Sequence, residues 1–223
     1  MAAPPTRPAL RRRYDAKRDA VVQAAAALFA ARGYHATRMQ DLTEATGLTA
    51  GGLYHYFGSK EQLLIAICDA LMEPLLERVE ALELEAREPE AALRALVATW
   101  VAHVVAHRDH MLVFQRERHV IERDPQWHHV VARRKRFEQL LERALERVER
   151  ARGVPFADRR LTTFALLGMV NHLPQWHRPR GRLSPEQIAV GFCDMVLAAP
   201  SAGPSDAEAA SRGEAGTGGG MHG

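Results

Sequence analysis

Apolar residues recur three and four positions apart through most of this chain, which is the spacing of one face of an α-helix. No run alternates apolar and polar residues between hairpin turns, as a half-buried strand would. The pattern therefore predicts an all-α protein of about nine helices. The longer helices are expected at about 15–32, from residue 59 past residue 80, at 89–105, 124–152, 157–176 and 184–199.

Helix-capping residues set the expected boundaries. Thr37 with Gln40, Ser59 with Gln62 and Ser184 with Gln187 each match a capping box, in which two side chains satisfy the free backbone N–H groups of a helix start. Asp124 followed by Pro125 is typical of another start, while Gly33 and Gly153 are placed to end helices. Pro74 is expected to kink or divide its helix because proline lacks a backbone donor.

Residues 37–60, TRMQDLTEATGLTAGGLYHYFGSK, predict two short helices joined by a tight turn at Gly47. Leu42, Ala45, Leu48 and Leu53 are spaced to pack the two helices together. This is the arrangement of a helix-turn-helix unit, whose second helix enters the DNA major groove while the first crosses the backbone. Nine of the 30 basic and four of the 27 acidic residues lie in the first 60, so this segment carries +5 and the remainder −2. Such an asymmetry favours a nucleic-acid partner.

Residue type also indicates how the second helix would meet DNA. Ala50, Gly51 and Gly52 are small enough to let it approach base edges closely, although glycine lowers helix propensity. Tyr54 either fills a small core or contacts a phosphate, and His55 is expected to face the groove. Tyr56 offers a hydroxyl, and Lys60 lies at the next helix start, where it can pair with phosphate.

The same segment resembles the TetR/AcrR family of bacterial one-component repressors. The resemblance lies in Gly33-Tyr34, in Thr37 through Leu42, in Gly47-Leu48-Thr49 and in Leu53-Tyr54-His55-Tyr56-Phe57-Gly58-Ser59-Lys60 with Leu63. It implies an operator-binding homodimer formed through residues 157–199, with a ligand-binding body. The resemblance and the residue types of the second helix together give the expected DNA contacts. These are Thr37, Arg38, Thr49, Ala50, Gly51, Gly52, Tyr54, His55, Tyr56 and Lys60.

Residues 165–188 resemble acyl-CoA-responsive repressors of fatty-acid or related degradation, through Gly168–Asn171, Trp176–Pro179 and Gly181–Glu186. This run is either a ligand signature or a turn and dimer-interface signature. The resemblance implies an acyl-CoA thioester as effector, and another hydrophobic ligand such as a drug is the alternative. The following residues are expected to line the pocket, although each of the apolar ones also suits plain core: Trp100, His103, Met111, Phe114, Trp127, Asn171, Trp176 and Arg178.

The sequence gives less support to metal binding or to catalysis. His103, His107 and His110 share a helical face and suit either a metal site or polar helix-end positions, and the expectation is no metal and no cofactor. No sequence motif of an enzyme is present, so an α-helical enzyme or carrier is the competing class. Cys68 and Cys193 are expected to be buried thiols in a cytoplasmic, non-membrane protein. Residues 133–136 and their flanking glutamates are expected to form a solvated helix face with i, i+4 ion pairs.

The expected organisation of the chain has four parts. Residues 1–14 form a basic arm, which either contacts DNA through Arg11–Arg13 or is merely solvated. Residues 15–60 form the helix-turn-helix domain, and residues 61–199 the ligand-binding and dimerisation domain. Residues 200–223 have almost no large apolar side chains and are expected to be a disordered tail.

Overall fold

The computed structural model describes residues 5–117 and 127–198, and within these ranges it contains helices and no strand, which confirms the all-α prediction. The helix start at Asp124–Pro125 and the tail 200–223 lie outside the described residues. The elements in chain order are α1 (Pro8–Arg32), α2 (Met39–Thr46), α3 (Ala50–Phe57), α4 (Lys60–Glu80), the 3-10 helix η1 (Leu84–Ala86), α5 (Pro89–Ala106), α6 (Arg108–Arg116), α8 (His128–Arg152), α9 (Arg159–Asn171), α10 (Leu173–Trp176) and α11 (Pro185–Leu197).

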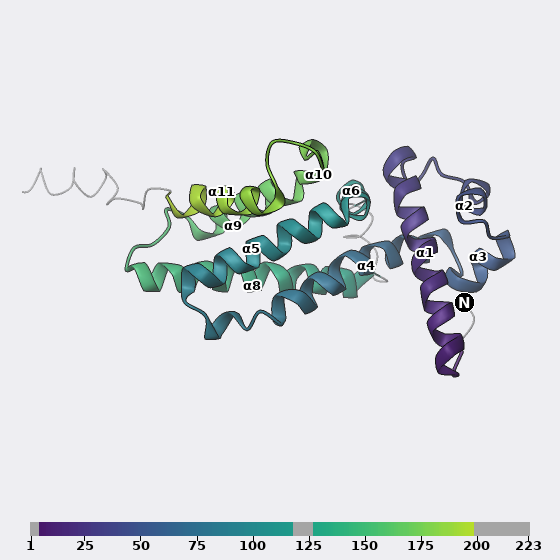
Figure 1. The fold of residues 1–223 in the computed structure, drawn as a ribbon, viewed down its shortest axis with the longest axis horizontal. Coiled ribbons are helices and arrows are strands. Elements are labelled where there is room, and N and C mark those ends of the chain that lie inside the picture. The colour runs from purple at the N-terminus through teal and green to yellow at the C-terminus, as the bar shows by residue number, and fades with distance from the viewer. Residues whose placement is uncertain (1–4, 118–126, 199–223) are drawn as a thin grey trace, which may run out of the picture.

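The molecule is elongated, with a small head at one end (Figure 1). Helices α1, α2 and α3 form the head, and α4 runs from it into the body, where it lies against α5 and α8. Helices α9 and α11 cover one side of the body, and α11 packs along α5. Helix α6 packs against both α1 and α4 and therefore connects the head with the body. None of the helices in the described part is long and apolar enough to cross a membrane.

Several predicted boundaries are confirmed by the capping contacts. The Ser59 hydroxyl accepts the Gln62 backbone N–H at 3.0 Å. At α11 the capping box is complete, because Ser184 accepts from Gln187 N–H at 3.3 Å and the Gln187 side chain accepts from Ser184 N–H at 2.9 Å. Gly153 ends α8 with a φ of 65°, a left-handed conformation that favours glycine.

Three local predictions are wrong. Helix α1 begins at Pro8, because proline at the first position suits a helix start, so Arg11–Arg13 belong to a helix. The Thr37–Gln40 box does not form: α2 begins at Met39, and Asp41 accepts the Arg38 backbone N–H at 2.7 Å. Of the two effects expected of Pro74, division of the helix is wrong, because α4 runs through it as one helix with buried apolar side chains on both sides.

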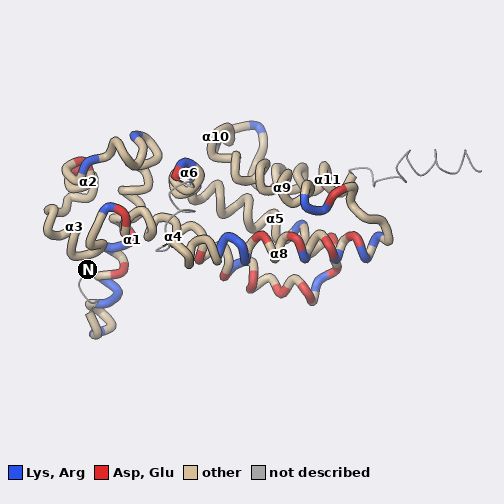
Figure 2. Tube along the Cα trace, turned by 180° about the vertical axis from the view of Figure 1, so that it is seen from behind, with Lys and Arg blue, Asp and Glu red and all other residues tan. Residues whose placement is uncertain are grey.

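The arginines of α8 at 133–136 were expected to be solvated, yet two of them bind the neighbouring α4. Arg133 contacts Asp69 at 2.5 Å and Glu73 at 3.0 Å, and Arg136 contacts Glu80 at 3.3 Å. Periodicity alone cannot reveal this, because the acidic partners lie about 60 residues earlier in the chain. Figure 2 shows acidic and basic positions close together where α4 and α8 run side by side.

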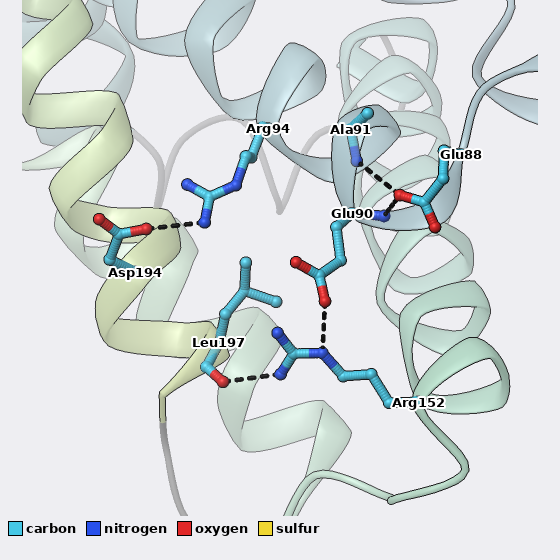
Figure 3. Close-up of polar contacts among 7 residues, drawn as sticks. All are labelled: Glu88, Glu90, Ala91, Arg94, Arg152, Asp194 and Leu197. Carbon is cyan, nitrogen blue, oxygen red and sulfur yellow. Dashed lines mark hydrogen bonds and ion pairs between the residues drawn. The ribbon is translucent and has the colours of Figure 1, made fainter.

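The end of the body farthest from the head is held by a set of polar contacts (Figure 3). Arg94 of α5 pairs with Asp194 of α11 at 2.7 Å. Arg152, at the end of α8, binds the Glu90 carboxylate and the Leu197 carbonyl oxygen, both at 2.7 Å. These contacts fix α11 against α5 and α8. Exposed pairs of this kind contribute at most about 1 kcal/mol each, so the buried apolar face of α11 supplies most of the stabilisation.

Both cysteines are free and buried, as predicted. Burial raises the pKa of Cys68, and it raises the pKa of Cys193 to about 11. Both groups are therefore protonated at neutral pH and unreactive.

Candidate DNA-binding surface and ligand cavity

The turn between α2 and α3 has the geometry of the predicted helix-turn-helix unit. Gly47 adopts a φ of 64°, and the Thr49 hydroxyl caps α3 by accepting the Gly52 backbone N–H at 3.1 Å. Leu42 and Leu53 are buried between the helices. Ala45, which was expected to join them, is exposed, because the eight-residue α2 turns that position toward solvent.

Most of the expected DNA contacts lie on the free surface of the head. Tyr54 is 47% exposed, so the alternative of core packing is wrong for this side chain. Gly52 is partly buried, and a methyl group placed on it would lie 3.4 Å from the Thr49 hydroxyl. The other exposed members of the expected set are Arg38, Thr49, Ala50, Gly51 and His55.

Two members of the set have internal contacts. Thr37 is 2% exposed, and its hydroxyl donates to the Gly33 carbonyl oxygen at 2.8 Å. The Thr37 hydroxyl therefore closes the turn after α1 and is turned into the head. Tyr56 is partly buried, with its ring centroid 4.8 Å from that of Tyr14 in α1. A resemblance between motifs could not separate these roles, because it conveys position along the chain and not the direction of a side chain.

Lys60 is the first residue of α4 and lies between the head and the body. Its ammonium group is 4.3 Å from the centroid of the Tyr34 ring, a cation–π contact. Burial lowers the pKa of Lys60, and the carboxylates of Glu117 and Asp41 act in the opposite direction. The Lys60 side chain is thus held by Tyr34 while part of it stays accessible.

The body contains a cavity of about 460 Å³ between α4, α5, α6, α8 and α9. Its interior is apolar and includes a Trp100–Phe137 ring contact at 4.7 Å. The polar lining residues are more exposed than the buried apolar ones, and together with the exposed Phe164 they mark the open side. The polar ones are Gln115, Arg134, Glu138, Asn171 and His172.

Half of the predicted pocket residues line this cavity, namely Trp100, Met111, Phe114 and Asn171. Trp127 is fully buried in the core and does not reach it. Trp176 and Arg178 are exposed at and after the short α10, away from the cavity lining. The run at 165–188 is therefore divided: Gly168 and Asn171 line the cavity, while its later residues form α10, the turn at 177–184 and the start of α11.

His103 is buried, and its Nε2 donates to the Leu71 carbonyl oxygen at 2.8 Å. The carbonyl can only accept, so this contact places the proton on Nε2 and leaves the buried Nδ1 without a partner. Burial is the main cause that lowers the pKa of both His103 and His110 to about 4. Within residues 5–117 and 127–198, no group of His, Cys, Asp or Glu has the geometry of a metal site.

Several cavity residues were missed by sequence reasoning. Arg134 and Glu138 form one of the expected i, i+4 pairs, at 3.8 Å on α8, but they line the cavity, which the expected solvated face did not indicate. Phe164 and Leu167 of α9 also line the cavity, although their strongly apolar segment gave no indication of which face is inward. The Gly168 and Asn171 positions quoted for the resemblance were the one available signal for this wall.

Helix α6 joins the cavity to the head. Met111, Phe114 and Gln115 line the cavity, and the next residue, Arg116, donates to the Ala30 carbonyl oxygen near the end of α1. The Glu117 carboxylate, which is 8% exposed, lies 3.7 Å from the imidazole of His35 in the head. A displacement of α6 would therefore act directly on α1.

Two family models match the chain. "Bacterial regulatory proteins, tetR family" matches residues 21–67, and "Tetracyclin repressor-like, C-terminal domain" matches residues 86–199. The chain belongs to the TetR family of bacterial transcriptional regulators, as the helix-turn-helix motif predicted.

Named relatives and solved structures share this architecture. The chain is 24% identical over 184 residues to the HTH-type transcriptional repressor KstR2 of Mycobacterium tuberculosis, covering 82% of this chain and 92% of that protein. It is similar to the structure of the TetR family regulator PfmR from Thermus thermophilus, with a TM-score of 0.72, 30% identity and coverage of 82% and 99%. It is also similar to AibR in complex with isovaleryl coenzyme A and operator DNA, with a TM-score of 0.69, 30% identity and coverage of 80% and 97%.

Proposed function

We propose that this chain is a repressor that binds a palindromic operator as a homodimer and releases it when an acyl-CoA thioester occupies the body. The observation that carries the proposal is that α6 forms part of the apolar cavity and ends on the head. An occupant of the cavity can thus change the position of the DNA-binding surface. The chain's assignment to transcriptional regulators and the absence of an enzyme motif in its sequence support a non-catalytic role in the cytoplasm.

The cavity suits the acyl part of such a ligand. A volume of about 460 Å³ lies within the usual range for small-molecule sites, and the apolar interior can take a hydrocarbon group. Arg134 at the open side can donate to a thioester carbonyl or to an anionic group, provided that it exchanges its contact with Glu138. The similar AibR structure holds isovaleryl coenzyme A, which favours a thioester over the drug-like alternative.

The region beside the cavity suits the CoA part. A surface cleft shares Glu138 and Phe164 with the cavity and is lined by Arg159 and Arg160 as well as by Glu142 and Asp158. Arg159 is already paired with Glu149 at 2.6 Å, whereas the Arg160 guanidinium lies over the Phe164 ring at 5.6 Å. Arg160 is therefore the better placed of the two for a phosphate of the ligand.

The proposed dimer interface is supported by an exposed apolar surface on α9 and α11. We call it the α9/α11 face; it consists of Leu161, Val190 and Met195, each at least 53% exposed. A second copy of the chain would remove these side chains from water. Two heads related by two-fold symmetry then match a palindromic operator.

The test uses DNA from the intergenic region upstream of the chain's own gene, with binding followed by fluorescence anisotropy. A palindrome-dependent and salt-sensitive complex is expected, and an acyl-CoA of suitable length should weaken it. Free CoA and the free acid of the same length are the controls. Absence of a palindrome-dependent complex would contradict the repressor proposal, and a complex that no acyl-CoA in a series from two to twelve carbons weakens would contradict the effector proposal alone.

A variant pair tests the cavity. Arg134→Gln should raise the acyl-CoA concentration that releases half of the operator DNA at least tenfold. The reason is that the ligand loses a charged hydrogen-bond donor worth about 1.5–3 kcal/mol. Arg136→Gln is the matched control, since Arg136 lies on the same helix but contacts Glu80. Both variants should bind operator DNA as the wild type does. An equal response in the two variants would remove Arg134 from the ligand site.

A further inference from the structure

The N-terminal turns of α1 are helical although few contacts within the described protein stabilise them. The buried residues of α1 begin at Val21, and every residue from Pro8 to Arg13 is exposed. The first turn contains no acidic residue and has no side-chain cap. Three consecutive arginines, Arg11–Arg13, follow near the helix end where cations are unfavourable, although this effect fades beyond the first turn. We call residues 11–13 the arginine segment.

The arginine segment is fixed relative to the DNA-reading helix by the aromatic residue that follows it. The Tyr14 ring centroid is 4.8 Å from that of Tyr56 and 6.2 Å from that of His55, both in α3. One turn later, the Arg18 guanidinium lies 5.3 Å from the Phe57 ring centroid. Because a helix rises about 1.5 Å per residue, the arginine segment lies within about 5 Å of Tyr14 along the α1 axis. The backbone of the segment therefore lies close to α3; at about 3.6 residues per turn, Arg11 and Arg13 project to either side of the face that carries Tyr14, and Arg12 projects from the opposite side.

The charges of this segment are only partly neutralised within the protein. Arg11 pairs with Asp15 at 3.0 Å. Arg12 and Arg13 have no acidic partner in residues 5–117 or 127–198, and both are exposed. Figure 2 shows the basic positions along the N-terminal half of α1. An anionic partner along this surface would offset both the arginine repulsion and the unfavourable placement at the helix start.

We infer that the arginine segment binds the phosphate backbone of operator DNA just outside the base pairs that α3 reads, with Tyr14 holding it in register. The inference rests on the proposed DNA-binding function. A helix about 10–12 Å across cannot itself enter a minor groove about 6 Å wide, so the segment stays at the groove edge. The phosphates are the nearest partners of its guanidinium groups there, and contacts to them carry no base specificity. Because the segment is already helical, binding does not have to order it, which favours affinity.

The test uses full-length protein and a duplex that the wild type selects from a random-sequence pool. Its palindrome is prepared with long flanks, with trimmed flanks, and with methylphosphonates that neutralise the flanking phosphates. On the long duplex, Arg12→Gln/Arg13→Gln should lower the slope of log affinity against log salt by about 0.9 for each phosphate that the arginines no longer neutralise. On the trimmed and methylphosphonate duplexes the double variant should bind as the wild type does.

Arg180→Gln/Arg182→Gln is the matched control, because it removes the same charge from exposed positions of the body. It should leave the salt slope unchanged. For Tyr14, the alanine variant should lower the slope although no charge is removed, and the phenylalanine variant, which keeps the ring, should restore it. The melting temperature of each variant shows whether the head remains folded.

The results separate the two proposals. If the wild type selects a palindrome and the arginine double variant keeps its full affinity and salt slope on the long duplex, the arginine segment is merely solvated and only this inference fails. If base changes in the flanks alter affinity as much as methylphosphonates do, backbone contact is wrong. If the wild type selects no duplex, the DNA-binding proposal fails and this inference fails with it.

Discussion

Gly51 and Gly52 adjoin in α3, yet their surroundings differ. A methyl group on Gly52 would contact Thr49 and Leu48 at 3.4–3.7 Å, whereas a methyl group on Gly51 would meet nothing within 4 Å. Nothing in the described head therefore requires glycine at position 51. Glycine lowers helix stability relative to alanine, so its presence on the exposed surface of α3 favours close approach by DNA.

Gly51→Ala should consequently separate stability from binding. The free energy of unfolding should rise by up to about 1 kcal/mol, because alanine has the higher helix propensity. The affinity for operator DNA should fall, because the added methyl group occupies space at the base edges. Chemical denaturation and anisotropy titration measure the two effects. A variant that gains stability and binds DNA with unchanged affinity would show that α3 does not approach the bases at Gly51.

His103 and His110 predict a loss of stability in acid. Their pKa values of about 4 in the folded chain lie below the ordinary value of 6.5, so the unfolded chain takes up protons that the folded chain excludes. Stability is unaffected above about pH 6.5 and falls as the pH drops toward 4, by roughly 3 kcal/mol for each histidine.

His103→Gln tests this effect, because the glutamine amide can keep the donor to the Leu71 carbonyl oxygen while removing the titrating group. The variant should lose less stability than the wild type between pH 6.5 and 4, as measured by denaturant unfolding. His128→Gln, at an exposed position on α8, is the control and should follow the wild type. Parallel curves for all three proteins would contradict a buried neutral His103.

At the scale of elements, the exposed α9/α11 face predicts how the chain associates. Val190→Glu/Met195→Glu should convert the proposed dimer to a monomer, because two charges would be buried without partners. Sedimentation velocity measures the mass. Leu10→Glu is the matched control, since Leu10 is 47% exposed but lies on α1. A dimer that persists in the double variant would place the interface elsewhere.

At the scale of the whole molecule, we predict that α6 couples ligand binding to DNA binding, because it lines the cavity and packs against α1. Arg116→Gln should weaken the contact with the Ala30 carbonyl oxygen while leaving the cavity intact. The acyl-CoA should then raise the melting temperature as in the wild type but change operator affinity less. An effector typically changes the affinity of a second site about 5- to 150-fold. In Arg116→Gln, the factor by which acyl-CoA lowers the affinity for operator DNA should move toward one.

Arg108→Gln is the control for this prediction. Arg108 lies at the opposite end of α6 and pairs only with the adjacent Asp109 among the described contacts. It should keep both the thermal shift and the loss of operator affinity. Full coupling in Arg116→Gln would show that the signal travels by a route other than the α6–α1 contact.

Local sequence was enough to predict the helical class, most helix ends and the position of the DNA-binding unit. These features depend on short-range chemistry: the 3.6-residue period, the Ser59 and Ser184 caps, and the Gly47 turn all act over a few residues. The family motif is local for the same reason. The prediction failed where local signals were ambiguous, as at Thr37, whose hydroxyl contacts Gly33 and does not cap α2.

Which side chains share a site depends on the packing of whole helices. Arg134 and Glu138 have the same charged pattern as a solvated surface, and only the packing of α8 against its neighbours places them at the cavity. Trp127 and Trp176 suited a pocket equally well by residue type, yet one lies in the core and the other in solvent. Contacts such as Arg116 with Ala30 and Arg133 with Asp69 join residues more than 60 positions apart. A local pattern cannot specify such partners, because they are brought together only when the helices pack.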